Sequence, residues 1–517
     1  MPELMGKDYS KDIHGNHYFR NVMFAMILIG TFAGMLGQTF LSTAYPTLMV
    51  NISLSTAQGA TTWYLLANGI MVPVSAYLTT KIPTRWLFMI AYGFTAAGTL
   101  IAMVAPTSNY NIFLLGRVVM AMGAGISLPL MMTVITNIFP PEKIGVPMGM
   151  GGLVIGLAPA IGPTYGGWIL SGNTKFLGIL QLGDWRTLFL APFVLLIIVT
   201  VLTPFLMADV LPNRNMKLDF ISLLESLLGF GLFLYGFTNV GNDGWGDAQS
   251  VIAPIIIGLV IIAFFIRRQL HMADPFLDLS VFKIKQFTVT TIAAAINTMA
   301  MMGVEMMLPT YIQNVHGLTA LQSGLLLLPG SVMMALMSPI VGGIYDKFGA
   351  KKLSFIGFIL LAIGTLPYLF LTATTPEAFI TITYWVRFVA IGLIMMPLIT
   401  SGMNALPVEK TAQGSASNNT VRMIASSVVV AILASVTTNV INSTKPAHHL
   451  STTNPLQYAD KMIQASLNGF HVSFGIAFGF AVLGIFVALF LHKGKVAPAP
   501  VREANKQEVT EEGGQKS

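Results

Sequence analysis

Cysteine is absent from the 517 residues of this chain. Its absence excludes disulfide bonds, thiol nucleophiles and thiolate-ligated metal sites. A phosphate-binding glycine loop ending in Lys-Ser or Lys-Thr is also missing, so the chain is not expected to use ATP by itself. We therefore expect neither a metal nor a cofactor.

Charge is scarce as well. Charged residues make up 9% of the chain, whereas soluble domains average about 25%. Hydrophobic residues make up 54%, and the mean hydropathy is +0.72. The first apolar stretch continues to about Val50 and is longer than the core of a removable signal peptide, about 7 to 15 residues. The composition predicts a multi-pass membrane protein that keeps its first span.

The basic residues indicate an orientation and not a nucleic-acid partner. The net charge is +7, but the Lys and Arg residues are spread over many short loops without interleaved aromatics. In the predicted topology the loops on one side carry Lys81, Arg85, Lys143, Arg214, Lys217, Arg267, Arg268, Lys283, Lys285, Lys347, Lys351, Lys352 and Lys410. The opposite loops carry only Lys175, Arg186, Lys445 and Lys461. Because basic loops remain in the cytoplasm, both termini are predicted to be cytoplasmic.

Fourteen apolar windows are long enough to cross about 30 Å of hydrocarbon. They cover residues 22–44, 57–80, 86–105, 110–137, 145–170, 187–208, 220–241, 251–266, 287–312, 322–345, 353–373, 378–401, 414–437 and 470–492. The sequence therefore predicts an all-α polytopic membrane protein.

An internal repeat divides these spans. FPPEK at 139–143 recurs as LPVEK at 406–410, and the same displacement superimposes the first and fifth spans on the ninth and thirteenth. The chain therefore reads as six helices, an inserted pair and six more helices. Two related six-helix halves around a midplane cavity are typical of transporters, although a duplicated structural scaffold would show the same periodicity.

The expected organisation follows from the spans and the repeat. It comprises a cytoplasmic segment at 1–21, a six-helix bundle at 22–208, the inserted pair with its flanking loops at 209–286, a second six-helix bundle at 287–492 and a disordered cytoplasmic tail at 493–517.

Residues 156–170, GLAPAIGPTYGGWIL, place four glycines and two prolines in one apolar helix. Each Gly costs a helix about 1 kcal/mol and each Pro about 3 kcal/mol, so this composition needs a reason. Ala158, Gly162 and Gly166 recur every four residues and share one face, with Pro163 and Gly167 beside it. Small residues let two helix backbones approach closely, and proline lets the helix bend. The corresponding helix of the second half has no Gly-Pro, so only one half carries the bend.

This stretch resembles a known motif. GPTYGG is similar to the antiporter motif of the major facilitator superfamily, found in drug and proton exchangers. Other similar segments are LLGRVVMAMGAG, DWRTLF, LDFISLLESLLGFGLFLYGF, LLLLPG and GGIYDKFGAKK. With fourteen spans, the chain is identified as a member of the drug:proton antiporter branch that has an extra central helix pair. The resemblance implies two bundles that rock around a central site.

The segment GGIYDKFGAKK contains two glycines, Gly342 and Gly349, that permit a tight turn, and Asp346, which could cap a helix or pair with a cation. The resemblance implies the cytoplasmic gating loop of the superfamily, with Asp346 as its latch and Lys351 nearby. The first-half counterpart keeps Lys81 and Arg85 but has threonines where an Asp is expected. Plain basic loops with one charged turn remain the alternative.

Arg117 lies within the fourth span, where a buried guanidinium needs a partner or a water-filled cavity. In the family the matching arginine, with a Gln three residues later, is implicated in proton transfer; here that position is Met120. Arg117 is therefore a candidate for proton coupling, with snorkelling to the interface as the alternative. Arg387 is a weaker copy of it in the second half.

Proton-coupled antiport requires an acid that is protonated from one side and released on the other. Many relatives carry it on the first span, but this chain reads LGQTFLSTAYP, with Gly37 at the expected acidic position. Glu305, deep in the ninth span, is the most deeply placed carboxyl elsewhere. We expect Glu305 to supply the missing titratable group. A counter-charge for a cationic substrate and a structural pair with Arg387 or Arg422 remain alternatives.

A cavity lining is harder to assign because helix rotations are not fixed by the sequence. Gln38, Trp63, Asn68 and Tyr311 are candidates. Several of the 31 methionines surround Glu305, and flexible thioethers suit varied apolar ligands, although methionine is also ordinary filler in apolar helices.

The leading interpretation is a monomeric, proton-coupled efflux transporter of the plasma membrane that exports hydrophobic or cationic compounds. An exporter of a dedicated metabolite, peptide or amino acid would share the same fold. A polytopic membrane enzyme is a remote alternative, because no cluster of acids or histidines marks one membrane face and no sizeable extramembrane domain is present.

Overall fold

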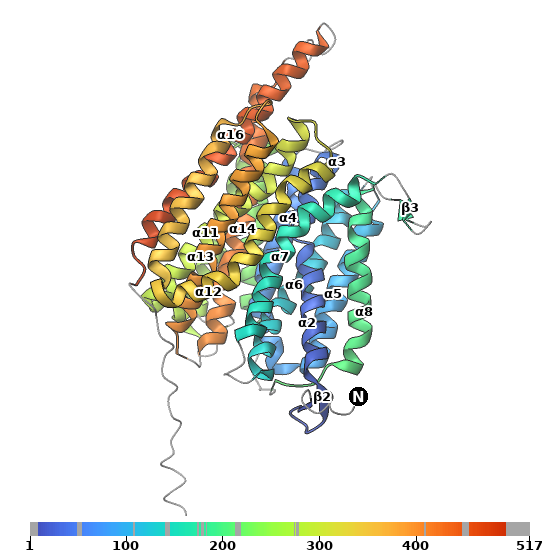
Figure 1. Ribbon diagram of the computed structural model, residues 1–517, viewed down its shortest axis with the longest axis vertical. Coiled ribbons are helices and arrows are strands. Elements are labelled where there is room, and N and C mark those ends of the chain that lie inside the picture. Colours follow the sequence, from blue (N-terminus) through green and yellow to red (C-terminus); the bar gives the residue numbers. More distant parts are fainter. Residues whose placement is uncertain are drawn as a thin grey trace, which may run out of the picture.

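The computed structural model is almost entirely helical, and most of its helices run side by side along one direction (Figure 1). It describes residues 9–48, 54–106, 109–139, 145–172, 175–176, 180–181, 184–211, 219–272, 275, 279–407, 410–446 and 454–492. We call the end of the bundle that carries the N-terminal strand β2 the inner end and the opposite end the outer end.

The first part of the chain forms α2 (Arg20–Leu36), η1 (Phe40–Ala44), α3 (Tyr45–Leu48), α4 (Leu54–Lys81), α5 (Thr84–Val104), α6 (Tyr110–Ile138), α7 (Gly145–Leu170), η3 (Trp185–Phe189) and α8 (Leu190–Leu206). The middle forms α9 (Phe220–Asp243), η4 (Ala248–Ile252), α10 (Ala253–His271) and η5 (Leu279–Lys283). The last part forms α11 (Lys285–Asn314), α12 (Ala320–Thr365), η6 (Leu366–Phe370), α13 (Glu377–Asn404), α14 (Thr411–Thr444) and α16 (Pro455–Ala488). Two antiparallel hairpins lie outside the bundle: β1 (Tyr9–Lys11) with β2 (His17–Phe19), and β3 (Lys175–Phe176) with β4 (Leu180–Gln181).

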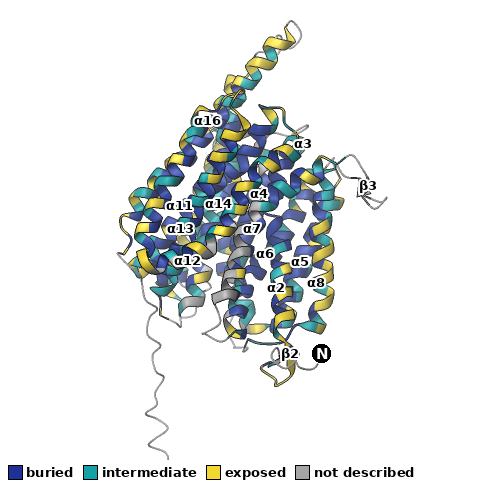
Figure 2. Cartoon of the chain, viewed as in Figure 1, coloured by how far each residue is buried: buried dark blue, intermediate teal, exposed yellow. Residues whose placement is uncertain are grey.

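Eleven helical segments within the described residues are long and apolar enough to cross a membrane. Large apolar side chains such as Val201, Phe220 and Phe264 are exposed on α8, α9 and α10. Figure 2 shows exposed residues along α8. Burial in lipid removes this surface from water and accounts for it. The chain is therefore a multi-pass membrane protein.

Local signals explain where several helices begin and end. The Thr319 side chain and Gln322 form a reciprocal capping box at the start of α12, and Asn454 caps α16 just before Pro455. Gly349 has a φ of 70°, which breaks α12 into two helical segments. The turn expected within GGIYDKFGAKK therefore lies at Gly349.

The outer ends of α14 and α16 extend further than their apolar windows, which stop at residue 437 and begin at residue 470. The helices continue to Thr444 and begin at Pro455, and their ends project beyond the rest of the bundle (Figure 1). Each has 34 residues, or roughly 50 Å at 1.5 Å per residue, which exceeds a hydrocarbon core of about 30 Å.

The core shows how the two halves meet. One large cluster of buried residues joins both halves, with members such as Phe40, Tyr45 and Tyr311. Hydrogen bonds between the halves lie toward the outer end, for example from Gln313 Nε2 to the Thr43 carbonyl oxygen (3.2 Å). Clusters nearer the inner end contain residues of one half each. The described contacts therefore close the outer end of the molecule.

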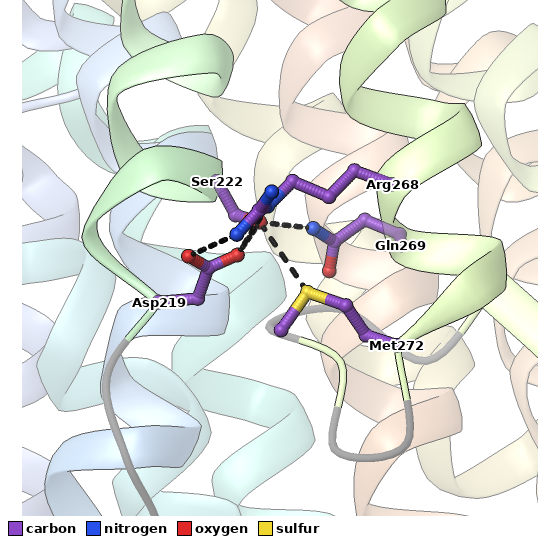
Figure 3. A network of polar contacts seen from close by, with 5 residues as sticks. All are labelled: Asp219, Ser222, Arg268, Gln269 and Met272. Atoms are coloured by element: carbon purple, nitrogen blue, oxygen red, sulfur yellow. Dashed lines mark hydrogen bonds and ion pairs between the residues drawn. The ribbon is translucent and has the colours of Figure 1, made fainter.

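The inserted pair is attached to both halves. Helix α9 packs on α10 and also on α4 and α14. At the inner end Arg268 donates two hydrogen bonds to Asp219, from Nε (2.7 Å) and Nη2 (2.9 Å), and Gln269 donates to Ser222 (2.5 Å) (Figure 3). Ser222 in turn donates to Asp219. This network ties the start of α9 to the end of α10.

Candidate functional site

A small cavity of about 30 Å³ lies between the two halves. Helices α2 and α6 of the first half and α11, α12, α13 and α14 of the second half supply its walls. The lining residues are Met35, Gln38, Leu128, Thr298, Met301, Met302, Glu305, Met334, Phe388, Met395, Asn419, Arg422 and Met423. A site built from both halves is exposed in turn to each side when the halves rock, so this cavity is the candidate site.

Methionine dominates the wall. Six of the thirteen lining residues are methionines, contributed by five different helices. Unbranched thioether side chains repack at low cost around ligands of different shape. The cavity therefore suits apolar ligands of variable shape better than a single ligand of fixed shape.

Glu305 is the acidic residue of this wall. Its helix, α11, is buried over most of its length because it packs against α13, α14 and α16. The Glu305 side chain is 1% exposed, and neither carboxyl oxygen has a hydrogen-bond partner among the described residues. A buried carboxylate without a partner is costly, which favours a group that changes protonation state or receives a ligand.

Arg387 interacts with Glu305 through space but is held by other groups. Its guanidinium donates to the Thr365 hydroxyl and, over 2.9 Å, to the Ala300 carbonyl oxygen. Its centre lies 5.7 Å from the Tyr368 ring centroid. No ion pair within 4 Å joins Glu305 to a basic group in the described part of the chain. The geometry therefore differs from a structural ion pair of Glu305 with Arg387 or Arg422.

Arg422 is the basic residue of the wall, and sequence reasoning considered it only as a partner of Glu305. It is 7% exposed and lies on α14. Its Nε donates to the Thr298 hydroxyl (3.3 Å), and its Nη2 lies 3.9 Å from the Met395 sulfur. The signal that could have identified it is an arginine in the middle of a predicted span.

Arg117 lies inside the first half and does not line the cavity. It is fully buried, which rules out snorkelling to the interface. Its Nη1 donates to the Gly37 carbonyl oxygen (2.7 Å), and its guanidinium lies 4.4 Å from the Tyr64 ring centroid. Cation–π contact and a backbone carbonyl thus take the place of a carboxylate partner.

Met120 occupies the space beside Gly37. A Cβ atom built on Gly37 would collide with the Met120 methyl group. The two positions that depart from the family pattern, Gly37 and Met120, are therefore in contact. The Met120 side chain therefore occupies the space that a side chain at position 37 would need.

The small residues of α7 meet two different neighbours. A Cβ on Gly162 would collide with Thr39, the residue before η1. A Cβ on Gly166 would collide with Thr43 within η1. A Cβ on Gly167 would collide with the Ala320 carbonyl oxygen of the second half. Ala158 and Pro163 are also buried.

The contact between α7 and α12 is formed by backbone atoms. Thr164 Oγ1 donates to the Gly324 carbonyl oxygen (2.8 Å). A Cβ on Gly324 would lie 2.7 Å from the Thr164 Cα. The smallness of the α7 residues therefore serves close packing within the first half and across the boundary between the halves, and Gly324 is a partner that sequence reasoning missed.

The predicted gating residues bind within their own halves. Arg85 donates from Nε to the Met207 carbonyl oxygen (2.9 Å), and Lys351 donates to the Leu489 carbonyl oxygen. Lys81 ends α4 with an exposed side chain. The surroundings of Gly342 and Asp346 lie outside what the structure describes, so the latch stays a prediction.

Of the four residues expected to line a cavity, Gln38 lines the one described here, whereas Trp63, Asn68 and Tyr311 are not among its lining residues. Trp63 packs with α9 and α14 residues. The Tyr311 hydroxyl donates to the Thr372 carbonyl oxygen (2.7 Å) at the outer end. The sequence does not fix the rotation of these helices about their axes, so it could not decide which of these residues line this cavity. Among the described residues no group of three or more His, Asp or Glu side chains could hold a metal ion.

Comparison with known proteins identifies relatives over nearly the whole chain. The family model of the Major Facilitator Superfamily matches residues 27–430. The uncharacterised MFS-type transporter YcnB of Bacillus subtilis is 38% identical, over 94% of this chain and 97% of its own length. The lincomycin resistance protein LmrB of Bacillus subtilis is 36% identical, over 92% and 96%. The multidrug export protein EmrB of Escherichia coli is 26% identical, over 87% and 86%.

Solved structures agree on the fold. A bacterial homologue of the human lysosomal transporter Spinster has a TM-score of 0.60 at 13% identity, over 93% of this chain and 99% of its own. The xylose transporter XylE of Escherichia coli has a TM-score of 0.58 at 13% identity, over 91% and 96%.

Proposed function

The chain belongs to the major facilitator superfamily and is a membrane transporter, not an enzyme, and from this premise we propose that it is a proton-coupled efflux pump for hydrophobic or cationic compounds. The observation that carries the proposal is the methionine-rich cavity between the halves with an unpartnered, buried carboxyl in its wall. Similarity to relatives named for lincomycin resistance and multidrug export supports the direction of transport.

Competition for Glu305 couples the two solutes. An ionised Glu305 attracts a cationic or polar substrate into an otherwise apolar site. A proton that enters from outside neutralises the carboxyl and weakens that attraction, so the substrate leaves. Return to the inner side releases the proton and restores the charge. Arg117 acts in the first half by holding α6 to the end of α2 at Gly37.

The proposed topology has fourteen spans. Eleven described segments satisfy length and apolarity. Helices α4 and α7 and the part of α12 before Gly349 supply the remaining three proposed spans. An even number of spans places both termini on the same side of the plasma membrane. The distribution of Lys and Arg favours the cytoplasmic side. The six-helix bundles at 22–208 and 287–492 and the inserted pair form one monomeric unit.

The decisive experiment measures ethidium movement in inverted membrane vesicles that contain the protein. Acidifying the lumen should drive dye into vesicles with the wild-type chain, and collapsing the pH gradient should stop it. Glu305→Gln removes the titratable group at nearly constant shape and should reduce gradient-driven transport to the level of empty vesicles. Glu225→Gln, an acid of α9 outside the cavity, is the matched control and should keep transport.

Two outcomes would contradict the proposal. Dye movement that is indifferent to the gradient would identify a facilitative carrier. Unchanged gradient-driven transport in Glu305→Gln would remove this carboxyl from the mechanism.

A further inference from the structure

The cavity wall carries two opposite charges that are not paired with each other. Glu305 has no hydrogen-bond partner among the described residues, and Arg422 bonds to one hydroxyl and contacts one thioether sulfur. A guanidinium has five N–H donors, so these two contacts leave donors for a ligand. Both side chains are more than nine-tenths buried and line the same cavity.

The spacing of two α11 residues gives the positions of the two charges along the wall. Arg422 binds the hydroxyl of Thr298, which lies seven residues before Glu305 on that helix. Seven residues are close to two turns, so Thr298 and Glu305 lie on one face, roughly 10 Å apart along the axis. The base and the acid therefore mark two places on one wall, separated by about that distance. Methionines Met301 and Met302 lie between them.

Electrostatics favours a ligand that matches both charges. A simple cation that binds ionised Glu305 leaves Arg422 as an unmatched charge in a low-dielectric site. A simple anion that binds Arg422 leaves Glu305 with only the through-space attraction of Arg387. A molecule with a protonated amine and an anionic group at its two ends neutralises both, and its apolar middle contacts the methionines.

We propose that Glu305 and Arg422 form a two-charge recognition site for amphoteric amphiphiles, in which a protonated amine and a carboxylate flank an apolar core and lie roughly 10 Å apart. This inference rests on the proposed export function and specifies its preferred substrate class. Arg422 acts here as a specificity-determining residue, because its planar fork accepts a carboxylate through two parallel hydrogen bonds.

The test uses four probes and purified protein in nanodiscs without a pH gradient. The main probe is 4′-(aminomethyl)biphenyl-4-carboxylic acid, which has an amine and a carboxylate at opposite ends of two rings. Its methyl ester lacks the anion, its N-acetyl derivative lacks the cation, and 4-(aminomethyl)benzoic acid shortens the separation by one ring. Displacement of bound ethidium gives the affinity of each.

Wild-type protein should bind the two-ring amphoteric probe roughly tenfold or more tightly than each of the other three. Arg422→Met should abolish the preference over the ester, and Arg422→Lys, which keeps the charge without the fork, should keep part of it. Glu305→Gln should abolish the preference over the N-acetyl derivative. Arg267→Met, an exposed arginine of α10, is the matched control and should keep both preferences.

Equal affinity of the wild type for the amphoteric probe and its ester would overturn the two-charge site, whether or not any variant folds. An equal loss of all four probes in Arg422→Met would also overturn it, because that result assigns Arg422 to holding α14 against α11. Neither result bears on gradient-driven ethidium transport. Failure of that transport is the separate test of the proposed export function.

Discussion

Gly37 stands where the resemblance to the family predicts an acid, and the Met120 side chain fills the space beside it. Arg117 lies against the same place, with Nη1 2.7 Å from the Gly37 carbonyl oxygen. A buried arginine that donates to a carbonyl oxygen and a thioether sulfur and faces two aromatic rings keeps its charge with little compensation. Among the described residues Arg117 is therefore a buried cation without an acidic partner within ion-pair distance.

Restoring the acid tests this description. Gly37→Asp alone should lower the thermal midpoint by several degrees, because the new Cβ collides with the Met120 methyl group. Gly37→Asp with Met120→Ala should recover most of that loss, because the carboxylate then fits beside Arg117. Tryptophan fluorescence during heating in detergent gives both midpoints. A single variant as stable as the wild type would show that the space is free.

The sequence was sufficient to predict Glu305 as a deeply placed carboxyl, because an acid within an apolar helix differs from all its neighbours. The structure places it in the cavity wall. It was not sufficient to place Arg422, Thr298 or Asn419 in the same wall, since lining depends on how each helix is rotated about its axis. Uniformly apolar helices carry almost no information on that rotation. For the same reason the sequence could not decide that Tyr311, a candidate, is absent from the lining of this cavity and bonds to the Thr372 carbonyl oxygen.

At the scale of helices, α7 and α12 approach each other through backbone atoms, and Gly324 is the residue that allows it. Gly324→Ala places a Cβ 2.7 Å from the Thr164 Cα, where no flexible side chain can yield. We expect the outer contact between the halves to open at a cost of about 1 to 3 kcal/mol and transport to fall at least several-fold. Gly475→Ala, where a Cβ meets nothing within 4 Å, is the matched control. Equal transport by both variants would refute this role of Gly324.

The ion pair between Asp219 at the start of α9 and Arg268 of α10 leads to a pH-dependent prediction. The hydrogen bonds from Arg268 hold the pKa of Asp219 below its ordinary value, burial opposes them, and Ser222 adds to the lowering. Because the pKa is depressed in the folded state, the carboxylate stabilises the fold above the unfolded value, about 4, and this contribution is lost as the pH falls through the folded value.

Asp219→Asn should therefore lower the thermal midpoint at pH 7 by about 1 to 2 °C, a small effect because Arg268 is partly exposed. The difference from the wild type should shrink as the pH falls below about 4, toward the lowered pKa of Asp219. Asp460→Asn, an exposed carboxyl on α16, is the control and should show no such trend. A difference that is constant with pH would mean that the ion pair does not stabilise this helix pair.

The bounds of a helix or turn were predictable where hydropathy or small residues mark them in the sequence. The window 145–170 coincides with α7, and the turn in GGIYDKFGAKK is at Gly349. The outer extensions of α14 and α16 were not predictable, because polar residues continue a helix beyond the hydrocarbon and hydropathy does not register it. Tertiary contact between the two helices supports those extensions.

At the scale of the whole molecule, the contacts between the halves describe a transporter that is closed at its outer end. Ser42 lies in this closed region and is fully buried. Because the natural chain has no cysteine, Ser42→Cys introduces one thiol. A membrane-impermeant maleimide added outside should label it slowly in resting cells and faster in Ser42→Cys combined with Gly324→Ala. Ser443→Cys, exposed at the outer end of α14, should label quickly in both backgrounds. Labelling of Ser42→Cys as fast as that of Ser443→Cys would contradict the closed outer end.

Helix α9 packs on both α4 and α14 and so spans the junction where these two helices meet. The other junction, between α7 and α12, has no comparable covering helix within the described chain. A compound dissolved in the bilayer therefore meets two different junctions between the halves. The α4–α14 junction is covered by α9, whereas the α7–α12 junction is not covered by a further helix of the described chain. If the transporter takes up lipophilic molecules sideways from the bilayer, we expect entry only at the α7–α12 junction, which makes its two sides in the plane of the membrane unequal.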